Sequence, residues 1–393
     1  MPRPESLTVA VLLTLLVSLG PLSTDLYLPA LPTLEATFAT DMAAVQLTLS
    51  IFLAGFAVAQ LVCGPLSDRF GRRPVLLGGV ALYVVASVAC ALAATVDQLI
   101  VARLFQAFGG CCGPVLGRAV VRDVYGRERA ARMFAYMAMA MALAPAVAPV
   151  IGGLLVSWPG WRATFGLLAL IGTGLLVAIW RLLEETNDQR NPEAIDPERL
   201  LGNYLLLLGE RSYRGYVLCF AAVFSSLFTF ISGSPFVLIG GIGLAPVQYG
   251  FCFAAVVGGY MAGSFVSGRL TVRLGLERMI RYGLMATNLG GLLGFALAAA
   301  GLATVPAIIA PMALVMAGAG LVLPNAMAGA IAPFGTMAGT ASALLGFTQM
   351  LVAAVVGVII GHIGDRGPLA MMAAIALANL LAAFAYWGHR RHW

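Results

Sequence analysis

The chain has 393 residues, of which 61% are hydrophobic and only 10% are charged, and its formal net charge is +6. Soluble globular domains carry about 25% charged residues, so this composition excludes an ordinary soluble protein. The chain contains no lysine, which excludes a P-loop nucleotide site and Schiff-base chemistry, because both depend on a lysine amine. No HExxH zinc motif occurs, so no metal site is predicted, and loop arginines account for the positive charge without a nucleic-acid partner.

Apolar runs recur along the whole chain at the length that a membrane-spanning helix needs. One crossing of the hydrocarbon takes about 20 residues. Helices are expected, because an open sheet edge would leave polar backbone groups unsatisfied in lipid. The sequence therefore predicts an all-α membrane protein with twelve transmembrane helices, at about 7–29, 43–65, 74–95, 98–119, 133–156, 163–182, 214–238, 248–269, 279–300, 304–326, 338–362 and 368–388.

The arginines are distributed unevenly between the two sides of these spans. If the N-terminus is placed in the cytoplasm, 20 of the 23 arginines fall on the cytoplasmic side, two fall outside, and Arg103 lies within a span. Cytoplasmic loops of membrane proteins carry an excess of arginine and lysine. We therefore expect both termini to be cytoplasmic in a multi-pass protein of the plasma membrane.

A long polar segment divides the chain into two halves of six spans each. The predicted units are an N-terminal bundle at 1–183, a cytoplasmic linker at 184–213 and a C-terminal bundle at 214–393. The halves match when one is shifted by 204 residues, which aligns Gly64 with Gly268, Arg69 with Arg273 and Gly71 with Gly275. Such a repeat is typical of transporters built from two parallel bundles, so two pseudo-symmetric six-helix bundles are predicted.

The first predicted span ends near an acid, Asp25. Acids at membrane depth are costly and usually functional, as a proton site or as the partner of a cation. Asp25 lies about 18 residues into an outward-running helix and Arg103 about 5 residues into an inward-running one, so a rise of about 1.5 Å per residue puts both near one depth. The spacing therefore allows an ion pair between them. The alternative is an acid at the outer headgroups that only caps a helix end.

The loop between the second and third spans is short and strongly charged. It contains Gly64, Asp68, Arg69, Gly71, Arg72 and Arg73. Asp68 is predicted to act as a conformational latch, because the eleventh span begins near Gly339 with its positive helix end on the same side of the membrane. The alternative is that Asp68 merely balances the neighbouring arginines.

The fourth span carries Arg103 and Gln106, three residues apart and therefore on one helix face. A permanent charge within an apolar run indicates function, and the alternative is an arginine that extends to the interface. Arg118 and Arg122 lie at the cytoplasmic end of this span. We expect them either to help close the cytoplasmic side or to anchor the helix at the headgroups.

The fifth span combines prolines with glycines, at Pro145, Pro149, Gly152 and Gly153. Proline removes a backbone donor and bends a helix, and glycine lets two helices approach closely. The pattern predicts a pliable contact between the two halves. The alternative is the proline and glycine content that is ordinary in membrane helices.

Polar and aromatic side chains within the spans could line a cavity for a small molecule. Ligand sites combine apolar walls with a few hydrogen-bonding groups. The predicted substrate contacts are Tyr27, Gln46, Arg103, Gln106, Phe224, Phe228, Asn325 and Gln349. For each of them, ordinary packing between helices is the alternative.

These motifs carry a resemblance to a known family. The charged loop from Gly64 to Arg73 resembles the signature between helices 2 and 3 of the major facilitator superfamily. Arg103 with Gln106 resembles the fourth-helix motif of its proton-driven members, and 144–153 resembles the fifth-helix motif of its drug antiporters. Segments 23–32 and 117–125 are similar to the Bcr/CflA branch of bacterial multidrug exporters.

The resemblance implies proton-driven export of small amphiphilic compounds or antibiotics across the bacterial inner membrane. It implies a transporter and not an enzyme, working in the lipid bilayer as a monomer, with the proton gradient in place of a cofactor. Our hypothesis is that Asp25 carries the proton and that Arg103 with Gln106 couples it to the substrate. The first alternative is a proton-coupled uptake permease for a metabolite, and the second is a membrane receptor or enzyme without transport.

Overall fold

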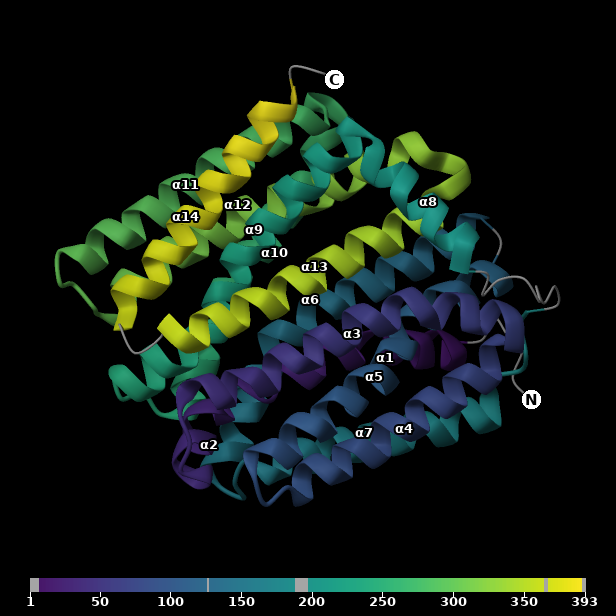
Figure 1. Cartoon of the computed structure of the whole chain (residues 1–393), viewed down its shortest axis with the longest axis horizontal. Helices are drawn as coiled ribbons and strands as arrows, with labels where there is room; N and C mark the ends of the chain where they lie inside the picture. Colours follow the sequence, from purple (N-terminus) through teal and green to yellow (C-terminus); the bar gives the residue numbers. More distant parts are fainter. Residues whose placement is uncertain (1–6, 126, 188–196, 364–366, 391–393) are drawn as a thin grey trace.

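The computed structural model describes residues 7–125, 127–187, 197–363 and 367–390, and within these ranges it contains helices and no strand. Long helices run beside one another through the molecule (Figure 1). They are α1 (Leu7–Asp25), α3 (Met42–Phe70), α4 (Arg72–Leu92), α5 (Val96–Val124), α6 (Arg127–Ser157), α7 (Arg162–Leu182), α9 (Arg211–Pro235), α10 (Pro246–Leu274), α11 (Leu276–Ala299), α12 (Val305–Ile331), α13 (Ala338–Ile363) and α14 (Gly367–Arg390).

These helices confirm the predicted spans one for one. In the described part of the chain, eleven segments are long and apolar enough to cross a membrane. The twelfth span corresponds to α6, which has 31 residues and contains the apolar stretch Leu143–Ser157. The all-α membrane fold expected from the sequence is therefore the observed one.

Two glycine turns confirm the register of the internal repeat. Gly71 separates α3 from α4 with a φ of 105°, and Gly275 separates α10 from α11 with a φ of 82°. Residues other than glycine rarely adopt such backbone angles, so each turn depends on its glycine. The two positions are those aligned by the 204-residue shift, and Val272 stands where the first copy has Asp68.

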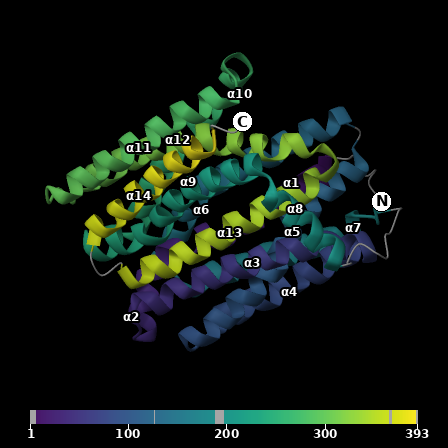
Figure 2. The ribbon, with the colours of Figure 1, turned by 45° about the horizontal axis from the view of Figure 1, so that its top comes forward.

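The helices pack as two groups of six. In the first group α5 contacts α1, α3 and α4, and in the second α9 and α11 each contact α12 and α14. The groups meet along two seams, α3 with α13 and α6 with α10. Figure 2 shows α13 lying along α3, as in Figure 1. One seam joins the second span to the eleventh, and the other joins the eighth span to the fifth. The second and eighth spans are equivalent in the two halves, and so are the fifth and eleventh. The two seams are therefore equivalent, as two pseudo-symmetric bundles require.

The predicted linker contains an element that its polar residues did not indicate. It contains a helix, α8 (Pro197–Gly209), which packs against α9 and α13. Proline suits the first turn of a helix, and of the leucine run at 205–208 Leu207 is fully buried while the other three leucines are exposed. Residues 188–196 of the predicted linker lie outside the described ranges.

Short helices follow α1 on the opposite side of the molecule from the charged loop. They are η1 (Leu28–Ala30) and α2 (Leu31–Phe38). Pro29 and Pro32 fall in their first turns, where the missing backbone donors cost nothing. We call the side that carries Arg72 and Arg122 the arginine-rich end, and the side that carries η1 the η1 end.

Candidate functional site

Arg103 of α5 lies wholly inside the first group of helices. Its side chain is fully buried, so it does not extend to the interface. Its Nη1 donates to the Ser23 carbonyl oxygen at 3.0 Å and to Gln106 Oε1 at 2.7 Å, and its Nε donates to the Thr48 carbonyl oxygen at 3.4 Å. The predicted pairing of Arg103 with Gln106 on one helix face is therefore confirmed. Gln106 in turn donates to Ser87 Oγ at 2.8 Å.

Three aromatic rings enclose the guanidinium of Arg103. Its central carbon lies 4.1 Å from the ring centroid of Phe52, 4.9 Å from that of Tyr27 and 5.9 Å from that of Phe165. A ring within about 6 Å stabilises a desolvated cation by about 2 kcal/mol or more. The Nη2 atom is buried and has no hydrogen-bond partner in the described part of the chain. The cation is thus held by neutral groups and keeps one donor unused.

Asp25 is the last residue of α1 and is only 5% exposed. Its carboxylate accepts a hydrogen bond from Thr24 Oγ1 at 3.1 Å. The depth argument holds, because Arg103 reaches the backbone of Ser23, two residues before Asp25.

The ion pair that the spacing allowed is not formed, however. Within the described residues the ion pairs are Arg72 with Asp68 and Arg72 with Asp123. The reason is that Arg103 turns toward backbone carbonyls of α1 and α3 and lies under the Tyr27 ring, where no carboxylate reaches it.

The glycines of the fifth-span motif make close backbone contacts on two sides of α6. A methyl group at Gly152 would lie 2.9 Å from the carbonyl carbon of Leu26, the residue after Asp25. A methyl group at Gly153 would lie 2.7 Å from the carbonyl carbon of Pro246 at the start of α10. Gly250 completes the seam, where a methyl group would lie 2.7 Å from Val150 Cα. The motif therefore joins the segment after Asp25 to the second group of helices.

The two prolines of this motif lie within α6, and Pro149 is buried against the seam. Its carbonyl oxygen lies 2.8 Å from the position of a methyl group on Gly250. Pro145 is half-buried one turn earlier. On the α10 side, Tyr249 is fully buried and its hydroxyl lies 3.2 Å from Ser234 Oγ.

Gln46 and Ser232 bridge the two groups of helices near the η1 end. Gln46 Nε2 donates to the Ser232 carbonyl oxygen at 2.5 Å, and Ser232 Oγ donates back to Gln46 Oε1 at 2.7 Å. Both side chains are fully buried. Gln46 was predicted to contact substrate, whereas in this structure both ends of its amide are bound to α9. Its partner lies 186 residues away in the chain, so no local pattern indicated it.

The remaining predicted substrate contacts are dispersed. Phe224 stacks on Phe220 with ring centroids 6.3 Å apart, and Phe228 is buried in the same helix. Asn325 donates to Ser267 Oγ at 2.7 Å in a network within the second group. Gln349 is half-buried in α13. The structure thus brings Tyr27, Arg103 and Gln106 together and leaves the other predicted contacts apart from them.

Arg72 is the centre of the charged loop. It binds Asp68, four residues before it, and its Nε donates to Asp123 Oδ2 of α5 at 3.0 Å. Arg73 Nη2 donates to the Trp180 carbonyl oxygen at 2.8 Å, whereas Arg69 is exposed beside the Phe70 ring. Asp68 thus does balance a neighbouring arginine, as the alternative interpretation held.

Glu185, which follows α7, makes a contact with the charged loop that was not predicted from the sequence. Its carboxylate accepts the backbone N–H of Arg72 at 2.8 Å and that of Arg73 at 3.3 Å, which caps the first turn of α4. Burial raises the pKa of this carboxyl, but backbone donors of Asn187, Arg72, Arg73 and Thr186 outweigh it and hold the pKa below its ordinary value. One feature of the sequence did indicate this contact. Glu184 and Glu185 directly follow the predicted span at 163–182, on the same side of the membrane as the three arginines of the charged loop.

A cavity of about 600 Å³ opens between the two groups at the arginine-rich end. It is lined by Gln60, Leu61, Gly64, Pro65, Asp68, Val115, Arg118, Arg122, Phe134, Tyr204, Gly339, Thr340, Ser342 and Ala343. Asp68 and the first turn of α13 therefore face the same space. No hydrogen bond joins Asp68 to α13 among the described residues, so the contact that the latch prediction requires is not formed in this structure.

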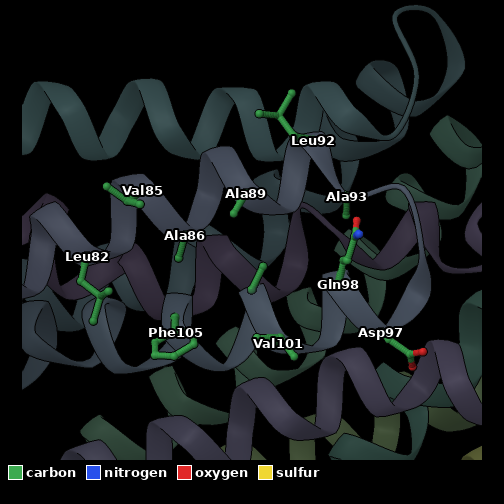
Figure 3. A pocket seen from close by; sticks show the side chains of 11 residues that line it. Leu82, Val85, Ala86, Ala89, Leu92, Ala93, Asp97, Gln98, Val101 and Phe105 are labelled. Carbon is green, nitrogen blue, oxygen red and sulfur yellow. The ribbon is translucent and has the colours of Figure 1, made fainter.

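A second hollow lies on the outer surface of the first group, between α4 and α5. Its volume is about 670 Å³ and its lining is largely aliphatic, with Asp97 and Gln98 at one end (Figure 3). Val85 and Leu92 on its rim are 67% and 75% exposed. This groove contains none of the predicted site residues, so we assign it no role in the site.

Comparison with known proteins supports this description. A family model described as Major Facilitator Superfamily matches residues 13–357. The chloramphenicol resistance protein of Pseudomonas aeruginosa is 35% identical over 336 residues, covering 84% of this chain and 77% of that protein. The bicyclomycin resistance protein homolog of Haemophilus influenzae is 28% identical over 375 residues, covering 95% of this chain and 94% of that protein.

The fold is also found among solved structures. A bacterial homolog of the human lysosomal transporter Spinster, in an inward-facing and unoccupied conformation, superposes with a TM-score of 0.75. The superposition covers 97% of this chain and 96% of that one, at 17% sequence identity. This likeness concerns the fold.

Proposed function

Because the chain belongs to the major facilitator superfamily, we propose that it exports small-molecule drugs or antibiotics across the bacterial inner membrane in exchange for protons. The names of the chloramphenicol and bicyclomycin resistance relatives support export over the alternative of an uptake permease. The proposal includes a monomeric transporter driven by the proton gradient, without an enzymatic reaction or a cofactor. It also includes both termini in the cytoplasm, as the distribution of arginines indicates.

The observation that carries the proposal is that Arg103 is buried at the level of Asp25 and forms no ion pair with a carboxylate among the described residues. A buried charge without an opposite partner is destabilising, and Arg103 still has an unused donor in Nη2. Asp25 is only 5% exposed at the same level, and its carboxylate forms no ion pair among the described residues. We propose that Asp25 is protonated in this conformation, and that it approaches Arg103 once its proton has left.

The two ends of the molecule support alternating access. At the η1 end the halves are joined by the Gln46–Ser232 hydrogen bonds and by the backbone contact of α6 with α10. At the arginine-rich end they are separated by the cavity that Asp68 and the first turn of α13 share. In the proposed cycle, drug enters this cavity from the cytoplasm, the Asp68 latch then closes, and the contacts at the η1 end open.

Resistance in an efflux-deficient bacterial host tests this function. Expression of the chain is expected to raise the inhibitory concentration of chloramphenicol or bicyclomycin and to lower cell-associated drug. The Asp25→Asn variant is expected to lose both effects, whereas Asp97→Asn, which changes an exposed acid at the start of α5, is expected to keep them. Drug accumulation in cells that express the wild-type chain would contradict export and support uptake.

A further inference from the structure

The cavity at the arginine-rich end has an uneven distribution of charge. Arg118 and Arg122 lie one turn apart on α5 and both line the cavity. The two guanidinium groups are therefore neighbours, and like charges at this spacing destabilise each other. The carboxylate among the described lining residues, Asp68, is bound to Arg72. Neither Arg118 nor Arg122 forms an ion pair within the described part of the chain.

The opposite wall of the cavity adds to the positive field. It is formed by the first turn of α13, with Gly339, Thr340 and Ser342. The start of a helix carries about half a positive charge and unsatisfied backbone N–H groups, which bind anions. Two arginines and a helix start thus face one space between the bundles, and each of them attracts an anion.

The other lining groups indicate an amphiphilic ligand. Phe134 and Tyr204 supply aromatic surface from α6 and α8. Gln60 lines the cavity from α3, with its side-chain amide packed close to Gly346 of α13. A volume of about 600 Å³ suits a drug-sized molecule.

We propose that this cavity binds amphiphilic organic anions, and that Arg118 and Arg122 hold the acidic group of a compound on its way to export. The proposal rests on the proposed function, because it names the charge class of the substrate. An anion between Arg118 and Arg122 removes their repulsion and accepts charge-assisted hydrogen bonds, which are about twice as strong as neutral ones. A cation of the same size gains neither.

Binding of two matched probes tests the proposal. We would measure equilibrium dialysis of 2-naphthalenesulfonate and of 2-naphthylmethylammonium against the full chain in phosphatidylcholine nanodiscs, with empty nanodiscs subtracted. The anion is expected to bind at least tenfold more tightly than the cation. In the Arg118→Gln/Arg122→Gln variant the affinity for the anion is expected to fall tenfold or more, since hydrogen bonds to charged groups are lost. Arg273→Gln, which changes an exposed arginine outside the cavity, is expected to bind like the wild type.

Several outcomes would overturn the proposal. Equal binding of the two probes, or an unchanged affinity in a double variant that keeps its gel-filtration profile and melting temperature, would show that the arginines do not select the ligand. Loss of anion binding in nanodiscs that contain phosphatidylglycerol would assign the site to a lipid headgroup instead. Binding is measured without transport, so anion selectivity in a chain that confers no resistance would count against the proposed function and not against this site.

Discussion

Replacement of Gly153 by alanine tests whether the α6–α10 seam holds the η1 end closed. The added methyl group would lie 2.7 Å from the carbonyl carbon of Pro246 and 2.9 Å from Val247 Cα, and both are backbone atoms that cannot rotate away. Ordinary contact therefore requires the two helices to separate. Overpacking of this kind typically costs about 1–3 kcal/mol. The cost applies only while the seam is closed, so the variant is expected to favour the conformation in which the η1 end is open.

Gly258 of α10 is the matched control. A methyl group there meets no heavy atom within 4 Å, and alanine has a higher helix propensity than glycine. Hydrogen–deuterium exchange at the start of α10 is expected to rise about fivefold or more in Gly153→Ala, since one kcal/mol is about that factor, and to stay unchanged in Gly258→Ala. Drug efflux is expected to fall only in Gly153→Ala. Equal exchange and equal efflux in the two variants would refute the argument.

Three further predictions follow from contacts in the structure. Ser232→Ala removes one hydrogen bond to Gln46 and leaves a buried amide oxygen without a donor, so the melting temperature in detergent is expected to fall by an amount equivalent to about 1–3 kcal/mol. Arg103→Lys keeps the charge but loses the fork that reaches three acceptors, and is expected to abolish proton-coupled efflux, so full coupling in this variant would contradict the role. The pKa of Glu185 is lowered in the folded state, so its contact with the charged loop stabilises the fold above about pH 4.5. This stabilisation is lost as the pH falls through the folded-state pKa. The Glu185→Gln variant is therefore expected to show a weaker pH dependence of the melting temperature in this acidic range.

The sequence allowed the spans and the internal repeat to be predicted because both depend on local physics. Spans follow from runs of apolar residues, and the turns at Gly71 and Gly275 follow from angles that favour glycine. The pairing of Arg103 with Gln106 is equally local, since three residues separate them on one helix. These predictions are confirmed.

Contacts between distant helices could not be predicted in the same way. Residue spacing indicates the depth of Asp25 and Arg103 but not the direction in which each side chain points, so the ion pair that the spacing allowed is not formed. The Gln46–Ser232 bridge joins two bundles, and neither residue differs locally from a packing residue. The capping of α4 by Glu185 depends on the path of the linker, which composition does not specify.

Proton movement in proteoliposomes tests the central claim most directly. With a pH-sensitive dye inside vesicles, addition of an exported drug is expected to cause proton release in the wild type and in Asp97→Asn. Asp25→Asn is expected to show no drug-driven proton movement while it keeps the folded gel-filtration profile. A drug-driven proton flux of wild-type size in Asp25→Asn would contradict the account, because the carboxylate at the level of Arg103 would then not carry the proton.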